Sequence, residues 1–206
     1  MQVTGSNQVA NIRYGLSIRQ GSDGQSFSLT EATLTEGGES IVEVSIDTPQ
    51  QMLLPATEGP SAEEAFAMCG VAKGDEMQIV ESAAGAWRLA ALLPTAAIKR
   101  ITKRHGGLAL RYTSPLVAAA ERATGQKRTG YTLILTKRHL YVVASREGAM
   151  LYAAALHCPT PADLLYSLAT VREEYPLEGG RVWLSGRQAA ELRKEVKRYF
   201  GKTVLE

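Results

Sequence analysis

A strand-to-helix turn near the end of the chain has the residue types of a nucleotide-binding wall. Residues 181–200 combine a short apolar strand, a turn at Ser185–Gly186 and an amphipathic helix. Such a turn can hold a ligand, because the first backbone N–H groups of a helix attract phosphate and a glycine lets a ligand approach the backbone closely. Only one glycine is present, and Arg187 follows it. The backbone pattern therefore favours a nucleotide pocket more than the side chains do.

The adjacent residues His157 and Cys158, just before a predicted helix, are a second candidate for chemistry. A helix N-terminus can stabilise a thiolate, and a histidine can activate it as a nucleophile. Adjacent side chains of an extended segment point to opposite sides, however, so we interpret Cys158 as a small residue that fills the turn. The three histidines, which include His105 and His139, are scattered along the sequence and predict no metal site.

Four clusters of basic residues offer a different chemistry, contact with nucleic-acid phosphates. Glutamates interleave with the later clusters, which is typical of solvated helix faces. The whole chain has 23 basic and 21 acidic side chains and a net charge of +2, which by itself indicates neither a nucleic-acid nor a membrane partner. Nucleic-acid binding stays an alternative. The clusters are Lys99–Arg104, Lys127–Arg128, Lys137–Arg138 and Arg193–Arg198.

Length and composition indicate a globular protein. The 206 residues can bury a substantial core, and contents of 45% apolar and 21% charged residues exclude wholesale disorder. The first residues lack the pattern of a signal peptide, and the most apolar stretch, 84–98, is interrupted by Arg88 and Pro94, so we expect no membrane insertion. Two cysteines without metal-ligand spacing favour the cytoplasm.

Alternating apolar residues predict strands in the first part of the chain. We expect an antiparallel meander of residues 14–18, 27–29 and 42–46, turning at Gly21–Gly24 and Gly37–Gly38 and extended by residues 52–55. The elements predicted next are a helix from the N-cap Ser61 to Cys69, a hairpin turning at Ala84–Gly85, a helix that Thr95 caps and that ends at His105, a strand at 108–112 and a helix at 114–125.

The same order of elements begins again after a polar segment at Gln126–Gly130. We therefore predict an internal structural repeat of two halves, residues 1–126 and 127–206, with two unrelated α+β modules as the alternative. The elements of the second half are strands at 131–136, 140–145 and 149–156, a helix at 160–176 with Thr160 as its N-cap, a strand at 181–185, a helix that ends at Gly201 and a strand at 203–205.

Two stretches resemble a known family. Residues 44–55 (VSIDTPQQMLLP) and 151–186 (LYAAALHCPTPADLLYSLATVREEYPL...VWLSG) are similar to an uncharacterised bacterial family, a domain of unknown function. This resemblance covers most of the chain. It implies an α/β actin-like ATPase fold, with mixed sheets and two ribonuclease-H-like halves, and a distant similarity to the cytoplasmic actin-like proteins of type IV pilus and type II secretion systems. Because family members usually run longer, a missing C-terminal element is one expectation for this chain.

The resemblance also implies where phosphate would bind. Actin-like ATPases hold phosphate in two hairpins with an Asp-x-Gly pattern, in which the Asp acts on magnesium and water. In the first hairpin Ser17 stands at the Asp position and Arg19 at the Gly position. In the second hairpin Ile134 stands near the Asp position and Thr136 near the Gly position. Both carboxylates are thus missing.

The adenosine-binding turn of such proteins reads apolar-x-Gly-Gly. Gly186 fits the first glycine, and Arg187 stands in place of the second, where a side chain would crowd the ligand. Without metal-holding carboxylates we expect no catalytic residue, no cofactor and no metal, and the same reasoning argues against a two-metal nuclease. The degenerate nucleotide-pocket positions are Ser17, Arg19, Thr136, Gly186 and Arg187.

These observations predict a cytoplasmic, non-catalytic actin-like scaffold or protein-binding module with a degenerate nucleotide site. Its expected partner is a protein, with a second copy of the chain as one candidate, rather than a nucleotide or a nucleic acid. Two alternatives stay open. One is an ATP-binding or weakly hydrolysing actin-like protein with a rebuilt site, and the other is a nucleic-acid-binding protein that uses the basic clusters.

Overall fold

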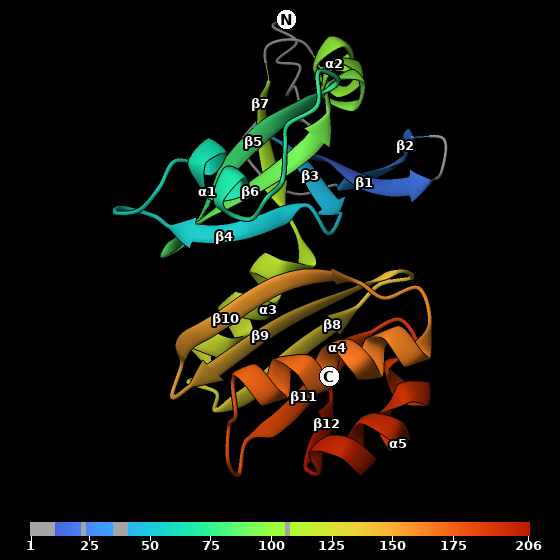
Figure 1. Cartoon of the computed structure of the whole chain (residues 1–206). Helices are drawn as coiled ribbons and strands as arrows, with labels where there is room; N and C mark the ends of the chain where they lie inside the picture. The colour runs from blue at the N-terminus through green and yellow to red at the C-terminus, as the bar shows by residue number, and fades with distance from the viewer. Residues whose placement is uncertain (1–10, 22–23, 35–40, 106–107) are drawn as a thin grey trace, which may run out of the picture.

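The computed structural model describes residues 11–21, 24–34, 41–105 and 108–206. These residues form three sheets and five helices. Figure 1 shows two bodies, with the elements up to residue 113 above and those from residue 115 onward below. The predicted α/β class is therefore confirmed. Every helix of the described part is too short or too polar to span a bilayer.

The first sheet contains, in spatial order, β2 (Gly24–Leu34), β1 (Asn11–Gly21), β3 (Ile41–Asp47) and β7 (Ala109–Thr113). β1 and β2 form an antiparallel hairpin, whereas β3 lies on the other side of β1 and runs parallel to it. The predicted antiparallel meander is therefore wrong at β3, and its second turn, Gly37–Gly38, lies outside the described residues. Alternation indicates which face of a strand is buried, not which neighbour it pairs with.

A second, smaller sheet contains, in spatial order, β4 (Gln51–Pro55), β6 (Trp87–Pro94) and β5 (Met77–Ala84), and is accompanied by α1 (Ala62–Met68) and α2 (Thr95–Arg104). The antiparallel pairing of β5 with β6 confirms the predicted hairpin. Residues 52–55 do not extend the first sheet as predicted, because β4 pairs with β6 and Leu54 packs with Phe66 of α1. Thr95 is not a cap either: Pro94 is the N-cap of α2 and no side chain caps this helix.

Capping residues set the start of two other helices as predicted. Ser61 and Glu64 form a capping box at α1, and Thr160 and Asp163 form another at α4 (Pro161–Glu174). Each box supplies acceptors for two backbone N–H groups that the first turn of a helix leaves without a partner.

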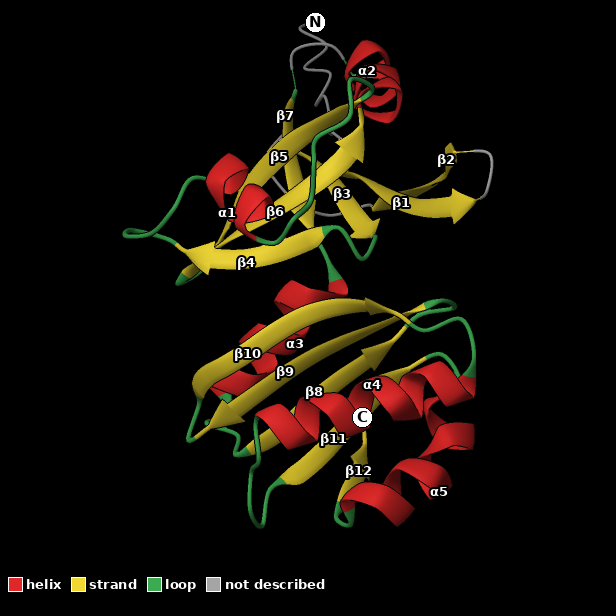
Figure 2. Ribbon diagram, in the orientation of Figure 1, coloured by secondary structure: helices red, strands yellow, loops and turns green. Residues whose placement is uncertain are grey.

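The second half is a five-stranded sheet with helices on both faces. Its strands, in spatial order, are β10 (Ala149–His157), β9 (His139–Arg146), β8 (Gly130–Leu135), β11 (Arg181–Gly186) and β12 (Thr203–Leu205). The antiparallel order of β8, β9 and β10 and the final strand β12 are as predicted. Figure 2 shows α4 and α5 (Ala189–Phe200) in front of this sheet and α3 (Pro115–Gly125) behind it.

β9 shows why this sheet is buried on both faces. Leu140, Val142 and Ala144 belong to the core with α4 and α5, whereas the alternate residues Tyr141 and Val143 pack with α3. A strand that is buried on both sides has a continuous apolar run rather than an alternating one. α3 therefore packs on the sheet of the second half although it precedes residue 126, and the predicted boundary at that residue stays a prediction.

Candidate functional site

The candidate site lies where the carboxyl ends of strands from both halves meet. β3 ends at Asp47 in the first half, and β8 and β11 end at Leu135 and Gly186 in the second. Thr136, the residue after β8, donates a hydrogen bond of 3.0 Å to the carboxylate of Asp47. Ligands of open α/β sheets bind outside the carboxyl ends of the strands. A nucleotide site of this fold is therefore expected at this edge.

One carboxylate oxygen at this edge joins the two halves. Oδ1 of Asp47 accepts hydrogen bonds from the Thr136 hydroxyl, from Nδ1 of His139 at 2.7 Å and from the Tyr141 hydroxyl at 2.6 Å. Tyr141 is fully buried and His139 is 3% exposed, whereas the Asp47 side chain is 25% exposed. We name these four residues the Asp47 network. Because a carboxylate only accepts, Nδ1 of His139 carries the proton in this contact.

The Asp47 network also fixes protonation states. Burial raises the pKa of Asp47, but the hydrogen bonds from His139, Tyr141 and Thr136 outweigh burial and leave that pKa below its ordinary value. Burial, together with the neighbouring charge of Asp47, raises the pKa of Tyr141 well above its ordinary value. At neutral pH the Asp47 carboxylate is therefore ionised and the Tyr141 hydroxyl keeps its proton.

The first phosphate hairpin predicted from sequence reaches this edge only in part. Ser17 lies beside Asp47 in the parallel pairing of β1 with β3 and is half-buried. Arg19 lies further along β1, and its side chain is outside the described part of the chain. Thr136 of the second hairpin belongs to the Asp47 network, and the Ile134 side chain is instead part of the packing around α3.

The predicted adenosine turn has a structural reason for its glycine. Gly186 lies opposite Leu135, has a φ of +95°, and a Cβ atom added to it would lie 2.1 Å from the Leu135 carbonyl oxygen. The glycine is therefore required by the approach of two strands, whatever binds nearby. The backbone N–H of Arg187 donates to the same carbonyl at 2.9 Å, and the Arg187 side chain is exposed.

Sequence reasoning missed three members of the network. In the sequence, Asp47 belongs to a stretch that resembles a family and Tyr141 to a predicted apolar strand. His139 counts only as one of three scattered histidines, whereas it is the first residue of β9. His139 and Tyr141 lie 92 and 94 residues from Asp47 in the sequence, so no local spacing indicates these contacts. The available signal was an acidic residue at the end of a buried apolar strand.

Cys158, next to His157, lacks the environment of a nucleophilic cysteine. The Cys158 thiol is buried and lies 3.5 Å from the Ser167 hydroxyl, and burial raises its pKa. A reactive cysteine requires the opposite shift. The His157 ring instead contacts the ring of His139, with 5.4 Å between centroids. Among the residues that the structure describes, no three His, Cys, Asp or Glu side chains are grouped to hold a metal ion.

A cavity of about 820 Å³ lies in the first half and is lined by none of the Asp47 network residues. Phe27 of β2, Thr95 and Lys99 of α2 and the acidic residues Asp75 and Glu76 all line it. Acidic and basic side chains thus face the same space, and the cavity offers no marked preference for phosphate.

Comparison with solved structures finds proteins of similar fold. A Bacteroides thetaiotaomicron VPI-5482 protein with an actin-like ATPase fold and unknown function matches with a TM-score of 0.71 and 16% identity, over 100% of this chain and 94% of that one. The PilM–PilN type IV pilus biogenesis complex matches with a TM-score of 0.55 and 11% identity, over 97% and 88%. The cytoplasmic domain of EpsL, an inner membrane component of the Vibrio cholerae type II secretion system, scores 0.38 with 12% identity, over 84% and 81%.

No protein-family model and no curated protein matches the sequence. The structural matches nevertheless show that the chain has the actin-like ATPase fold. The fold implied by the sequence resemblance is therefore confirmed.

Proposed function

We propose that this actin-like chain is a non-catalytic scaffold or protein-binding module whose nucleotide site is degenerate. The observation that carries the proposal is the Asp47 network. At the edge where strand ends of the two halves meet, Oδ1 of the carboxylate already accepts three hydrogen bonds from the second half. The side chains at this edge are arranged to hold the halves together rather than to hold a ligand between them.

The residues around the network also argue against phosphoryl transfer. Such transfer depends on metal ions that are held by carboxylates and that neutralise phosphate charge. Ser17 and Thr136 supply hydroxyls at two of the hairpin positions, and Asp47 is engaged with His139 and Tyr141. Arg187 adds a side chain where the family pattern has a glycine.

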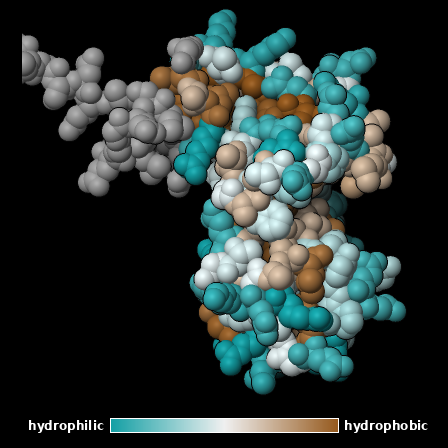
Figure 3. Space-filling model, turned by 90° about the vertical axis from the view of Figure 1, so that its left-hand side faces the viewer, coloured by the Kyte–Doolittle hydropathy of each residue, from teal (hydrophilic) through white to brown (hydrophobic). Residues whose placement is uncertain are grey.

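A protein partner is part of the proposal. One structure of the same fold, PilM–PilN, is a protein complex, so this fold can serve as a docking partner. Figure 3 shows a face on which hydrophilic residues predominate and hydrophobic residues gather in small separate patches. Recognition on that face would depend on specific sites rather than on one broad apolar surface. Both cysteines are free thiols, which agrees with the reducing cytoplasm as the proposed location.

The test is calorimetry and thermal unfolding with ATP and ADP, with and without magnesium. We expect no binding heat and no change in the unfolding midpoint at millimolar nucleotide. A ligand at 100 times its dissociation constant would add about 2.7 kcal/mol to the free energy of unfolding, which is easily measured. Magnesium-dependent binding by the wild-type chain would overturn the proposal.

The variant Asp47→Ala sharpens this test, because it removes the carboxylate that closes the site. We expect this variant to bind no nucleotide either. Binding by Asp47→Ala but not by the wild type would show an intact site that the network blocks, and would contradict a degenerate one.

A further inference from the structure

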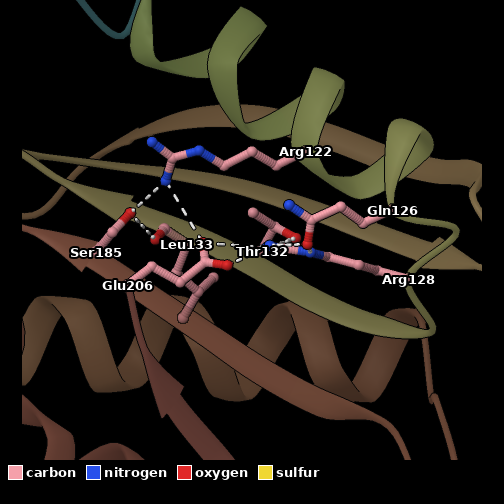
Figure 4. A network of polar contacts seen from close by, with 7 residues as sticks. All are labelled: Arg122, Gln126, Arg128, Thr132, Leu133, Ser185 and Glu206. Carbon is pink, nitrogen blue, oxygen red and sulfur yellow. Dashed lines mark hydrogen bonds and ion pairs between the residues drawn. The ribbon is translucent and has the colours of Figure 1, made fainter.

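A second polar cluster lies on the opposite side of the sheet from α4 and α5, beneath α3 (Figure 4). Arg128, which follows α3, donates to both carboxylate oxygens of Glu206, forming a close ion pair with Oε1 and a 3.2 Å hydrogen bond with Oε2. Arg122 of α3 points to the same carboxylate, 3.4 Å from Oε2, and donates to the Ser185 hydroxyl at 3.0 Å. We name Arg122 and Arg128 the arginine clamp.

The clamp is held in place by groups other than Glu206. The Gln126 side-chain oxygen accepts from Nε of Arg128 at 3.0 Å, and the Thr132 hydroxyl accepts from Nη1 at 3.2 Å. The guanidinium lies over the ring of Trp183, 4.6 Å from its centroid. The Arg128 side chain is only 2% exposed. A planar guanidinium fixed in this way is preorganised for a carboxylate, which it binds with two parallel hydrogen bonds.

The segment that brings Glu206 into the clamp lies at the edge of the sheet. β12 has three residues and, within the described part of the chain, pairs with β11 alone. Backbone hydrogen bonds on either side of it join Val182 to Lys202 and Glu206 to Leu184. Val204 and Leu205 are 38% and 37% exposed, and Gly201, with a φ of +77°, separates β12 from α5. Short edge strands with exposed side chains are among the parts of a fold that open most easily. Because β12 is the edge strand, its exchange for another strand would leave the pairing of β8 with β11 in place.

We propose that the arginine clamp and the adjoining edge of β11 form a binding site for an extended peptide that carries a carboxylate, and that β12 with Glu206 is its internal occupant. A partner strand would pair in parallel with β11 and place its acidic side chain on Arg122 and Arg128. This inference rests on the proposed role as a protein-binding module and names the chemistry of the partner.

Two physical arguments select this occupant. Main-chain pairing along a strand edge gives affinity, and a pocket for one side chain gives specificity. A buried charge without a counter-charge is strongly unfavourable, so Arg128 favours an anionic occupant of the clamp. Exchange of Glu206 for an acidic residue of the partner keeps the buried Arg128 paired, and the released Glu206 carboxylate is solvated by water. An apolar or basic peptide would leave the buried Arg128 guanidinium without an anionic partner.

The test uses labelled peptides and fluorescence anisotropy with the full chain. The probe is GKTVLE, the sequence of residues 201–206, and its control is GKTVLQ. Both peptides are amidated at the C-terminus, so that they differ only in the side-chain carboxylate. In the variant Glu206→Lys the internal occupant is repelled from the clamp. We expect this variant to bind GKTVLE at least tenfold more tightly than the wild type does, and at least tenfold more tightly than it binds GKTVLQ. Adding Arg128→Gln should remove most of that preference, and adding Arg122→Gln should reduce it.

Equal binding of the two peptides by Glu206→Lys, or binding of neither, would show that the ion pair only fastens β12 and would overturn the inference. Circular dichroism verifies that the variant is folded. If it is unfolded at the assay temperature, Glu206→Gln takes its place with the same expected order of affinities. Nucleotide binding would refute the proposed function and leave the peptide result standing, whereas loss of the peptide preference would refute the clamp alone.

Discussion

The Asp47 network gives a direct test of how the two halves are held together. In Asp47→Ala the Tyr141 hydroxyl and Nδ1 of His139 lose their acceptor, while the Thr136 hydroxyl keeps a 3.4 Å contact with the His139 carbonyl. A buried polar group without a partner lowers the free energy of unfolding by about 1–3 kcal/mol. Because the Asp47 side chain is 25% exposed, water can replace part of this loss. We expect a total loss of about 2–4 kcal/mol.

The assay is urea and thermal unfolding followed by circular dichroism. For a chain of this length each kcal/mol lowers the midpoint temperature by about 2–4 °C, so the expected decrease is about 4–16 °C. The matched control is Asp75→Ala, which removes an exposed carboxylate from a loop and should change the free energy of unfolding by less than about 0.5 kcal/mol.

A double-mutant cycle with Tyr141→Phe checks the contact itself. Tyr141→Phe should lower the free energy of unfolding by about 1 kcal/mol, and the two changes together should lower it by less than their sum, because they remove the same hydrogen bond. If Asp47→Ala unfolds at the same midpoint as Asp75→Ala, the network does not hold the halves together and the reasoning is refuted.

Three further outcomes follow from the same geometry. Because the folded-state pKa of Asp47 is lowered, its contribution to the free energy of unfolding should be complete above about pH 4 and should disappear as the pH falls through the folded-state pKa. In Asp47→Asn, this part of the loss of stability on acidification should be missing. Gly186→Ala should lower the free energy of unfolding by about 3 kcal/mol or more, since its Cβ would overlap the Leu135 carbonyl, whereas Gly179→Ala, with open space around it, should lose about 1 kcal/mol. A smaller loss for Gly186→Ala than for Gly179→Ala in thermal unfolding would contradict this. Arg187→Gly restores the second glycine of the adenosine turn but no carboxylate, so calorimetry should still detect no ATP binding; a measurable affinity would show that Arg187 alone closes the site.

Local signals predicted most helices and strands. The capping boxes at Ser61 and Thr160 depend on residues three positions apart, and the hairpin of β5 and β6 depends on a two-residue turn. The prediction of Thr95 as a cap was wrong, because the fixed φ of Pro94 already suits a helix entry. Signals of this kind lie within a few residues of the element that they determine.

Strand partners and the candidate site could not be predicted in this way. The parallel pairing of β3 with β1 and the separate sheet around β4 depend on which apolar faces pack together, and alternation does not encode that choice. The contact between Asp47 and Tyr141 spans 94 residues and exists only after both sheets have formed. A resemblance located the edge of the site through Ser17 and Thr136, but it did not indicate the carboxylate at its centre.

Helix α3 is synthesised before the strands that cover its apolar face. Leu116, Ala119, Ala120 and Ala123 of this helix are buried with Tyr141 and other residues of β9 and β10. During translation α3 leaves the ribosome before these strands, and a nascent chain folds from its N-terminus onward. Until β10 has been synthesised, the apolar face of α3 has no surface to cover it. A truncated product that ends after α3 would therefore be prone to aggregate, and α3 reaches its native packing only once β9 and β10 have formed.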